Sequence, residues 1–163
     1  MNKDLLFPTP IYSMDIGNVN FNKYLEKHIL KWKEEDKGMQ RTNVNGWHSL
    51  DNMQTKKEYQ PLIEDLYKAQ KIIYEKENYL SEPILGSMWA NINFSEGYNK
   101  PHMHPNSLWS GVYYVKTPNN CGDLKIEDPK SVSLMVMPNR KEPLPSYAER
   151  EINYKPVAGR LIM

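Results

Sequence analysis

The sequence has very few of the residues that would let the chain be cross-linked. Its one cysteine, Cys121, cannot form a disulfide within the chain. This predicts a protein of the reducing cytoplasm. Cys121 lies in a turn-like Pro-Asn-Asn-Cys-Gly-Asp segment with no histidine beside it in sequence, so a catalytic thiol is not predicted.

The sequence also lacks a long apolar run and an excess of charge of either sign. No stretch approaches the ~20 apolar residues that a membrane helix needs, and the first residues do not follow the pattern of a signal peptide. With 21 Lys and Arg against 20 Asp and Glu, the net charge is +1. This balance predicts no general attraction to nucleic acid or to an anionic membrane.

The residues that are present indicate one globular domain over residues 1–163. Hydrophobic residues make up 39% of the 163 and charged residues 25%. This composition is typical of a folded protein. We expect a helical N-terminal part over residues 1–83 and a β-rich core over residues 84–163.

The N-terminal part shows a short strand pattern and two helix patterns. A strand is predicted over residues 11–16. The apolar spacing from Phe21 to Trp32 predicts a helix that Asn20 could cap at its start and Gly38 at its end. A second helix is predicted over residues 60–79, with Pro61 in the first helical position.

After residue 83, strand-like runs alternate with turn clusters. Strands are predicted over residues 84–94, 108–116, 123–127, 131–137, 151–154 and 160–163, with a turn at 95–99. Short strands at this spacing, preceded by helices, favour a mainly β fold. We expect a double-stranded β-helix (jelly roll) with two helices packed on its outside.

Two histidines, His102 and His104, are the strongest candidates for chemistry. In an extended strand, residues two apart project from the same face, so both imidazoles could reach one metal ion. The alternative is a pair of solvated loop side chains. His48, in the polar 41–50 segment beside Trp47, could be a third ligand, a substrate contact or only a brace for its loop.

Several blocks together resemble a known family over nearly the whole chain. They are Leu-Phe-Pro-Thr-Pro-Ile-Tyr (6–12), Thr-Asn-Val-Asn-Gly-Trp-His-Ser (42–49), Trp-Ala-Asn-Ile-Asn (89–93), His-Met-His-Pro-Asn-Ser (102–107), Ser-Gly-Val-Tyr-Tyr-Val (110–115), Gly-Asp-Leu-Lys-Ile-Glu-Asp-Pro (122–129) and Pro-Val-Ala-Gly-Arg-Leu-Ile-Met (156–163). With these blocks the chain resembles the Fe(II)- and 2-oxoglutarate-dependent oxygenases of the double-stranded β-helix fold, closest to a group of small bacterial and viral members.

The resemblance implies one Fe(II) ion, with 2-oxoglutarate and O2 as co-substrates. His102 takes the place of the first metal histidine. His104 falls where most of the superfamily has an Asp or Glu, because the usual ligands are two histidines and a carboxylate. A set of three histidines is the alternative, and Glu96 and Asp123 are nearby carboxylates that could substitute.

The resemblance also implies residues for 2-oxoglutarate. Ser110 and Tyr114, four apart on the predicted strand, match positions that hydrogen-bond 2-oxoglutarate in related hydroxylases. Asn91 and Asn93 alternate onto one face of the preceding strand. They could point into the same pocket or satisfy polar groups at a sheet edge.

In the resembled family, further strands with a distal metal histidine and an arginine for 2-oxoglutarate follow the Gly-Arg-Leu-Ile-Met block. No histidine follows His104 here, and the sequence ends in an apolar run at Met163. We therefore expect the chain to be C-terminally incomplete. An edge exposed in this way favours pairing with a second chain, so a homodimer is one alternative for the oligomeric state.

The function implied is hydroxylation of an unknown substrate, with release of succinate and CO2. One alternative is a non-catalytic β-sandwich binding module whose groove is lined by Trp47, Trp89, Trp109 and Tyr113. The other is a Zn(II) or Ni(II) enzyme of cupin type, where His-x-His also supplies ligands.

Overall fold

The computed structural model describes residues 1–130, 135 and 138–163, and the strand predicted over 131–137 lies almost wholly outside them. Two compact units are formed, one by Tyr12–Thr117 with Val157–Met163 and the other by Met1–Ile11 with Pro118–Pro156. Within the described ranges, no helix combines the length and the apolar character needed to cross a membrane.

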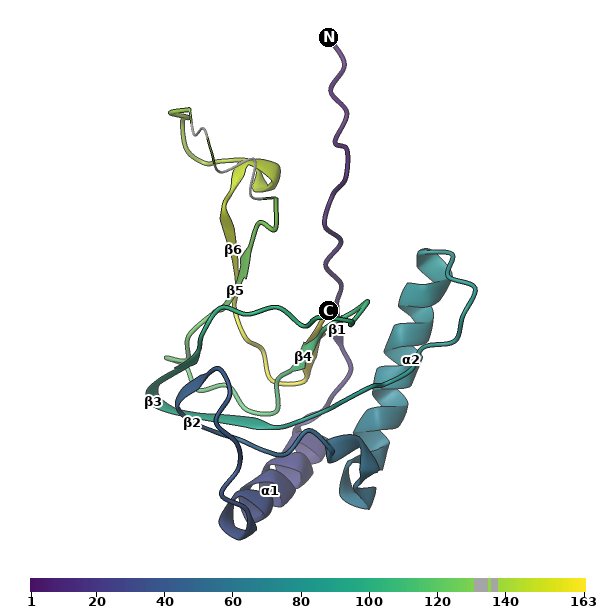
Figure 1. The fold of residues 1–163 in the computed structure, drawn as a ribbon, viewed down its shortest axis with the longest axis vertical. Coiled ribbons are helices and arrows are strands. Elements are labelled where there is room, and N and C mark those ends of the chain that lie inside the picture. Colours follow the sequence, from purple (N-terminus) through teal and green to yellow (C-terminus); the bar gives the residue numbers. More distant parts are fainter. Residues whose placement is uncertain (131–134, 136–137) are drawn as a thin grey trace. The chain divides into compact units, whose positions relative to one another are not determined.

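The larger unit contains the two α-helices (Figure 1). These are α1 (Val19–Glu35) and α2 (Gln60–Lys76), with the short 3-10 helices η1 (Met53–Thr55) and η2 (Lys57–Tyr59) before α2. Each α-helix carries an apolar stripe at helical spacing, and the two stripes enter one core. The buried apolar helix residues are Leu25, Ile29 and Trp32 of α1 and Leu62, Ile63, Leu66, Ala69 and Ile73 of α2.

The ends of both helices differ from the predicted ones for local reasons. Asn18, not Asn20, caps α1, because its extended backbone lets its side chain accept a hydrogen bond from the Phe21 amide at 3.0 Å. The helix α2 ends at Lys76, before the predicted Tyr79. Asn78 takes a left-handed φ of 56°. The Tyr79 amide donates to the Tyr74 carbonyl at 3.0 Å, which closes a Schellman turn.

The strands of the larger unit form two antiparallel sheets. One has the order β1-β7-β4, built from β1 (Ser13–Asp15), β7 (Arg160–Ile162) and β4 (Val112–Tyr113). The other pairs β2 (Asn43–His48) with β3 (Asn91–Asn99), which run alongside each other in Figure 1. The buried side chains of Leu161 and Met163 join the helix core.

The smaller unit is built around a third antiparallel pair. Strands β5 (Leu124–Glu127) and β6 (Glu151–Tyr154) pair in full register, and the 3-10 helix η4 (Ser146–Ala148) precedes β6. Lys125 and Glu151 form an ion pair across the two strands at 2.9 Å. The prediction of strands at 123–127 and 151–154 is confirmed.

The described part of the chain thus has two α-helices and several antiparallel sheets, an architecture compatible with a jelly roll. The described strands do not close a barrel. The predicted strand over 108–116 is wrong in its length, because its partner β7 has only three residues and so only Val112–Tyr113 form a ladder.

The segment around β3 also departs from the prediction. Residues 84–90 form no ladder; Met88 instead makes an isolated bridge to Asn52 before η1. The residues predicted as a turn at 95–99 lie inside β3, where residues 94–97 form a bulge opposite Asn45 and residues 98–99 are paired with β2. Glu96 has the left-handed φ of 61° that is typical of turns. The bulge bends the strand and does not end it.

We expect Leu25→Ala to destabilise the larger unit by about 2–5 kcal/mol, because Leu25 is fully buried and its loss leaves a cavity. Leu30→Ala is the matched control on the same helix, since Leu30 is 44% exposed. Urea unfolding of the two variants measures the difference. Equal unfolding midpoints would contradict the core assignment.

We also expect a pH-dependent contribution from the Asp15–Arg160 pair that joins β1 to β7. Arg160 Nε donates to Asp15 Oδ1 at 2.7 Å and lowers the pKa of that carboxyl. The contribution is present above the ordinary carboxyl pKa and is lost as pH falls through the lowered one. Asp15→Asn should therefore lower the unfolding midpoint near neutral pH and leave it unchanged in strong acid. Glu35→Gln, which removes an exposed helix pair, is the control; an Asp15→Asn effect that persists in acid would refute this assignment.

Candidate functional site

The two candidate metal histidines lie in the connection that follows β3. His102 and His104 are flanked by Pro101 and Pro105 and belong to no ladder, so the prediction that they sit on a strand is wrong. Pro105 disfavours helical backbone at His104, the residue before it. Their rings are 4.8 Å apart between centroids at 79°, so the structure does bring the two imidazoles together.

The ring of His102 is oriented by the backbone. Its Nδ1 lies 2.7 Å from the carbonyl oxygen of Lys100. A carbonyl oxygen only accepts, so this nitrogen carries the proton and the lone pair is on Nε2. Metal-binding histidines commonly use this arrangement, in which one ring nitrogen donates to a carbonyl and the other binds the ion.

His104 is half-buried and favours its neutral form. Burial lowers the pKa of His104 below its ordinary value, and the neighbouring His102 lowers it further. A neutral imidazole is the form that binds a metal. The donor set of this pair therefore fits a divalent transition metal.

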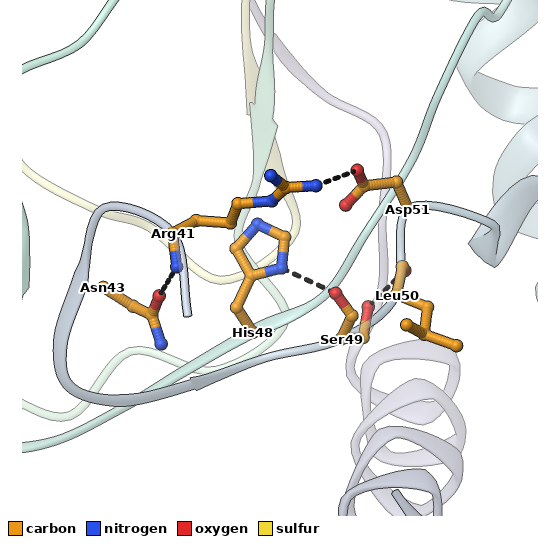
Figure 2. A network of polar contacts seen from close by, with 6 residues as sticks. All are labelled: Arg41, Asn43, His48, Ser49, Leu50 and Asp51. Carbon is orange, nitrogen blue, oxygen red and sulfur yellow. Dashed lines mark hydrogen bonds and ion pairs between the residues drawn. The ribbon is translucent and has the colours of Figure 1, made fainter. Parts of the chain in front are cut away.

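A buried polar corner at the end of β2 lies next to these rings. His48 is only 6% exposed and Ser49 is fully buried. The Nδ1 of His48 lies 2.6 Å from the Ser49 carbonyl oxygen, and the Ser49 hydroxyl donates to the Leu50 carbonyl at 2.8 Å. Figure 2 shows these contacts together with the Arg41–Asp51 ion pair at 3.5 Å.

The ring of Trp89 contacts both His48 and His104. Its indole stacks on His48 at 5.5 Å between centroids, and it also meets His104 at 5.5 Å. No sequence pattern singled out this contact, because Trp89 lies outside every ladder. The sequence marked Trp89 only as the start of the Trp-Ala-Asn-Ile-Asn block and as a groove residue of the binding-module alternative.

A pocket of about 500 Å³ opens beside the end of β2. It is lined by the connection between α1 and β2 and by Trp47, His48 and Phe94. Gly38 belongs to this lining, and its left-handed φ of 73° lets the chain turn there. A Cβ at this position would clash with the His48 carbonyl oxygen, so a larger residue would displace His48.

Two of the four residues predicted for 2-oxoglutarate lie on β3, and the other two flank β4. Asn91 and Asn93 lie on β3 where it pairs with β2, exposed and on the same face. Ser110 is exposed just before β4, whereas Tyr114 is half-buried just after it. The Tyr114 backbone continues the pairing with β7, since its amide donates to the Arg160 carbonyl at 3.0 Å.

No third ligand joins the histidine pair within the part of the chain that the structure describes, where no three His, Cys, Asp or Glu side chains form a metal-binding group. His48 is in contact with Trp89 and fits the role of a brace. Asp123 is engaged by Lys155 at 3.0 Å, and Glu96 is exposed in the β3 bulge.

The aromatic residues of the binding-module alternative have different partners. Trp47 packs on Trp32, and Trp109 packs edge-on against Tyr12. The Tyr113 hydroxyl donates to a side chain of α1. These contacts are those of core packing and do not favour a common groove.

Comparison with known proteins agrees with the donor set. The model of the family described as "Putative 2OG-Fe(II) oxygenase" matches residues 87–163, which include His102, His104, Ser110 and Tyr114. No curated protein matches the chain. The match covers the β-rich part of the chain and supports its resemblance to the 2OG-Fe(II) oxygenases.

Proposed function

We propose that this protein is an Fe(II)- and 2-oxoglutarate-dependent oxygenase in which His102 and His104 are metal ligands. The observation that carries the proposal is the close approach of their rings, 4.8 Å between centroids, inside the segment that matches the family. Two imidazoles on one short segment are suitable ligands for Fe(II).

Different features of the structure favour metal binding by the two histidines. His102 keeps its proton on Nδ1 through the Lys100 carbonyl and would bind through Nε2. Burial lowers the pKa of His104, so near neutral pH this ring would not have to release a proton when it binds the ion. Together they would supply two ligands, and a complete site would need a further ligand besides the co-substrates.

We propose Ser110 and Tyr114 as hydrogen-bond donors to 2-oxoglutarate, with Asn91 and Asn93 as further contacts. All four lie in the family-matched segment, and hydroxyl and amide groups are suitable partners for carboxylate and keto oxygens. When bound, Fe(II) would activate O2, with one oxygen atom going to succinate as 2-oxoglutarate loses CO2 and the other to the hydroxylated C–H bond of the substrate.

The proposal extends to the fold. We propose that the antiparallel sheets belong to one double-stranded β-helix domain over residues 1–163, with α1 and α2 outside it. The homodimer stays a prediction. The cupin-type alternative uses the same two histidines, so it differs from the oxygenase in the bound metal and in the need for 2-oxoglutarate.

We expect the protein, mixed anaerobically with Fe(II) and 2-oxoglutarate, to develop a weak visible charge-transfer band. His102→Ala and His104→Ala should each abolish the band, since losing a ligand costs more than the roughly 10–100-fold in affinity lost with a residue that only orients a ligand. His28→Ala is the matched control, because His28 packs on Tyr24 of the same helix at 4.4 Å. A band of equal strength in both single variants would exclude the pair. Protein that retains Zn(II) and develops no band with Fe(II) would favour the cupin type.

Tyr114→Phe and Ser110→Ala should weaken binding of 2-oxoglutarate without changing binding of Fe(II) alone. One lost hydrogen bond of about 1 kcal/mol corresponds to roughly a fivefold rise in dissociation constant. Titration of the charge-transfer band with 2-oxoglutarate measures this, and Tyr24→Phe, an exposed tyrosine of α1, is the control. Unchanged half-saturation in both variants would remove these residues from the co-substrate site.

A further inference from the structure

An unbroken series of ring contacts leads from the buried corner of β2 to the histidine pair. His48 stacks on Trp89 with an interplanar angle of 12°, and Trp89 meets His104 at 38°. His104 in turn meets His102 edge-on. The series joins a fixed part of the fold to side chains that lie outside every ladder.

The two histidines of the pair are oriented in different ways. The His102 ring is held by its hydrogen bond to the Lys100 carbonyl. Within the described part of the chain, the His104 ring makes ring contacts and no hydrogen bond. A ligand histidine normally needs a second partner that fixes its orientation, and an unfixed side chain loses rotamer entropy when it binds. Something else must therefore hold His104.

Trp89 is itself fixed by its neighbours in the fold. The Ser49 amide donates to the Ala90 carbonyl at 3.0 Å, and the Ala90 amide donates back to the Ser49 hydroxyl at 3.0 Å. These two bonds lock the backbone next to Trp89 onto the end of β2. Behind the indole, the stacked ring of His48 is buried and tied to Ser49.

We propose that Trp89 is a positioning residue that holds the His104 imidazole in its metal-binding orientation, with His48 as the support behind the indole. The inference rests on the proposed function, since it assigns a role toward the same metal ligand. It also gives His48 a role other than third ligand. The aromatic face of Trp89 orients His104, as the hydrogen bond to the Lys100 carbonyl orients His102.

The test combines one measurement without metal and one with metal. In the metal-free protein, NMR of the imidazole protons should show an upfield ring-current shift for His104 that Trp89→Ala removes. Titration with Co(II), followed by its visible bands, should then show about 10-fold weaker binding for Trp89→Ala, the lower end of the effects seen for residues that orient a ligand. Trp89→Phe and His48→Phe keep a stacked ring, so both should stay within about threefold of wild type.

Trp109→Phe is the control, because it removes an indole that packs on Tyr12. If Trp89→Ala fails to fold, Trp89→Leu gives the same comparison with an apolar side chain. Wild-type Co(II) affinity and an unshifted His104 signal in the Trp89 variants would overturn the inference. If wild type binds no Co(II), the proposed function fails, and the metal-free ring shift alone decides whether Trp89 positions His104.

Discussion

The register of β2 on β3 is the constraint on which the site depends. His48 pairs with Asn91, and beyond that pair the buried Ser49 exchanges hydrogen bonds with Ala90. Because the register fixes where β3 begins, it also fixes Trp89 just before the strand. A slip of one residue would turn every β3 side chain to the other face.

A backbone hydrogen bond at His102 and burial at His104 are two different ways of favouring metal binding by an imidazole. The Lys100 carbonyl assigns the tautomer of His102, whereas burial lowers the pKa of His104 and ring contacts surround it. Neither the hydrogen bond at His102 nor the burial of His104 involves a charged side chain. This suits a site that must present neutral imidazoles to a divalent cation, since a nearby carboxylate would favour the protonated ring.

Much of the fold could be predicted from local signals. Helix periodicity located α1 and α2, and short apolar runs located β1, β5, β6 and β7. The spacing of His102 and His104 also predicted that their rings would approach. The sequence could not show how little of the predicted strand over 108–116 forms a ladder, because Val112–Tyr113 alone have ladder partners in β7 and Tyr114 adds one backbone hydrogen bond to Arg160. The β3 bulge and the Trp89 contacts were also beyond reach, since they follow from tertiary pairing and not from local propensity.

The most direct test of the account follows the four histidine rings during a metal titration. Zn(II) is added to metal-free protein labelled with ¹⁵N, and long-range proton–nitrogen spectra report each imidazole nitrogen. We expect the His102 and His104 signals to shift together with one ion per chain, with His102 changing at Nε2, while His28 stays unchanged. Independent shifts of His102 and His104, or an equal response of His28, would contradict a shared metal site.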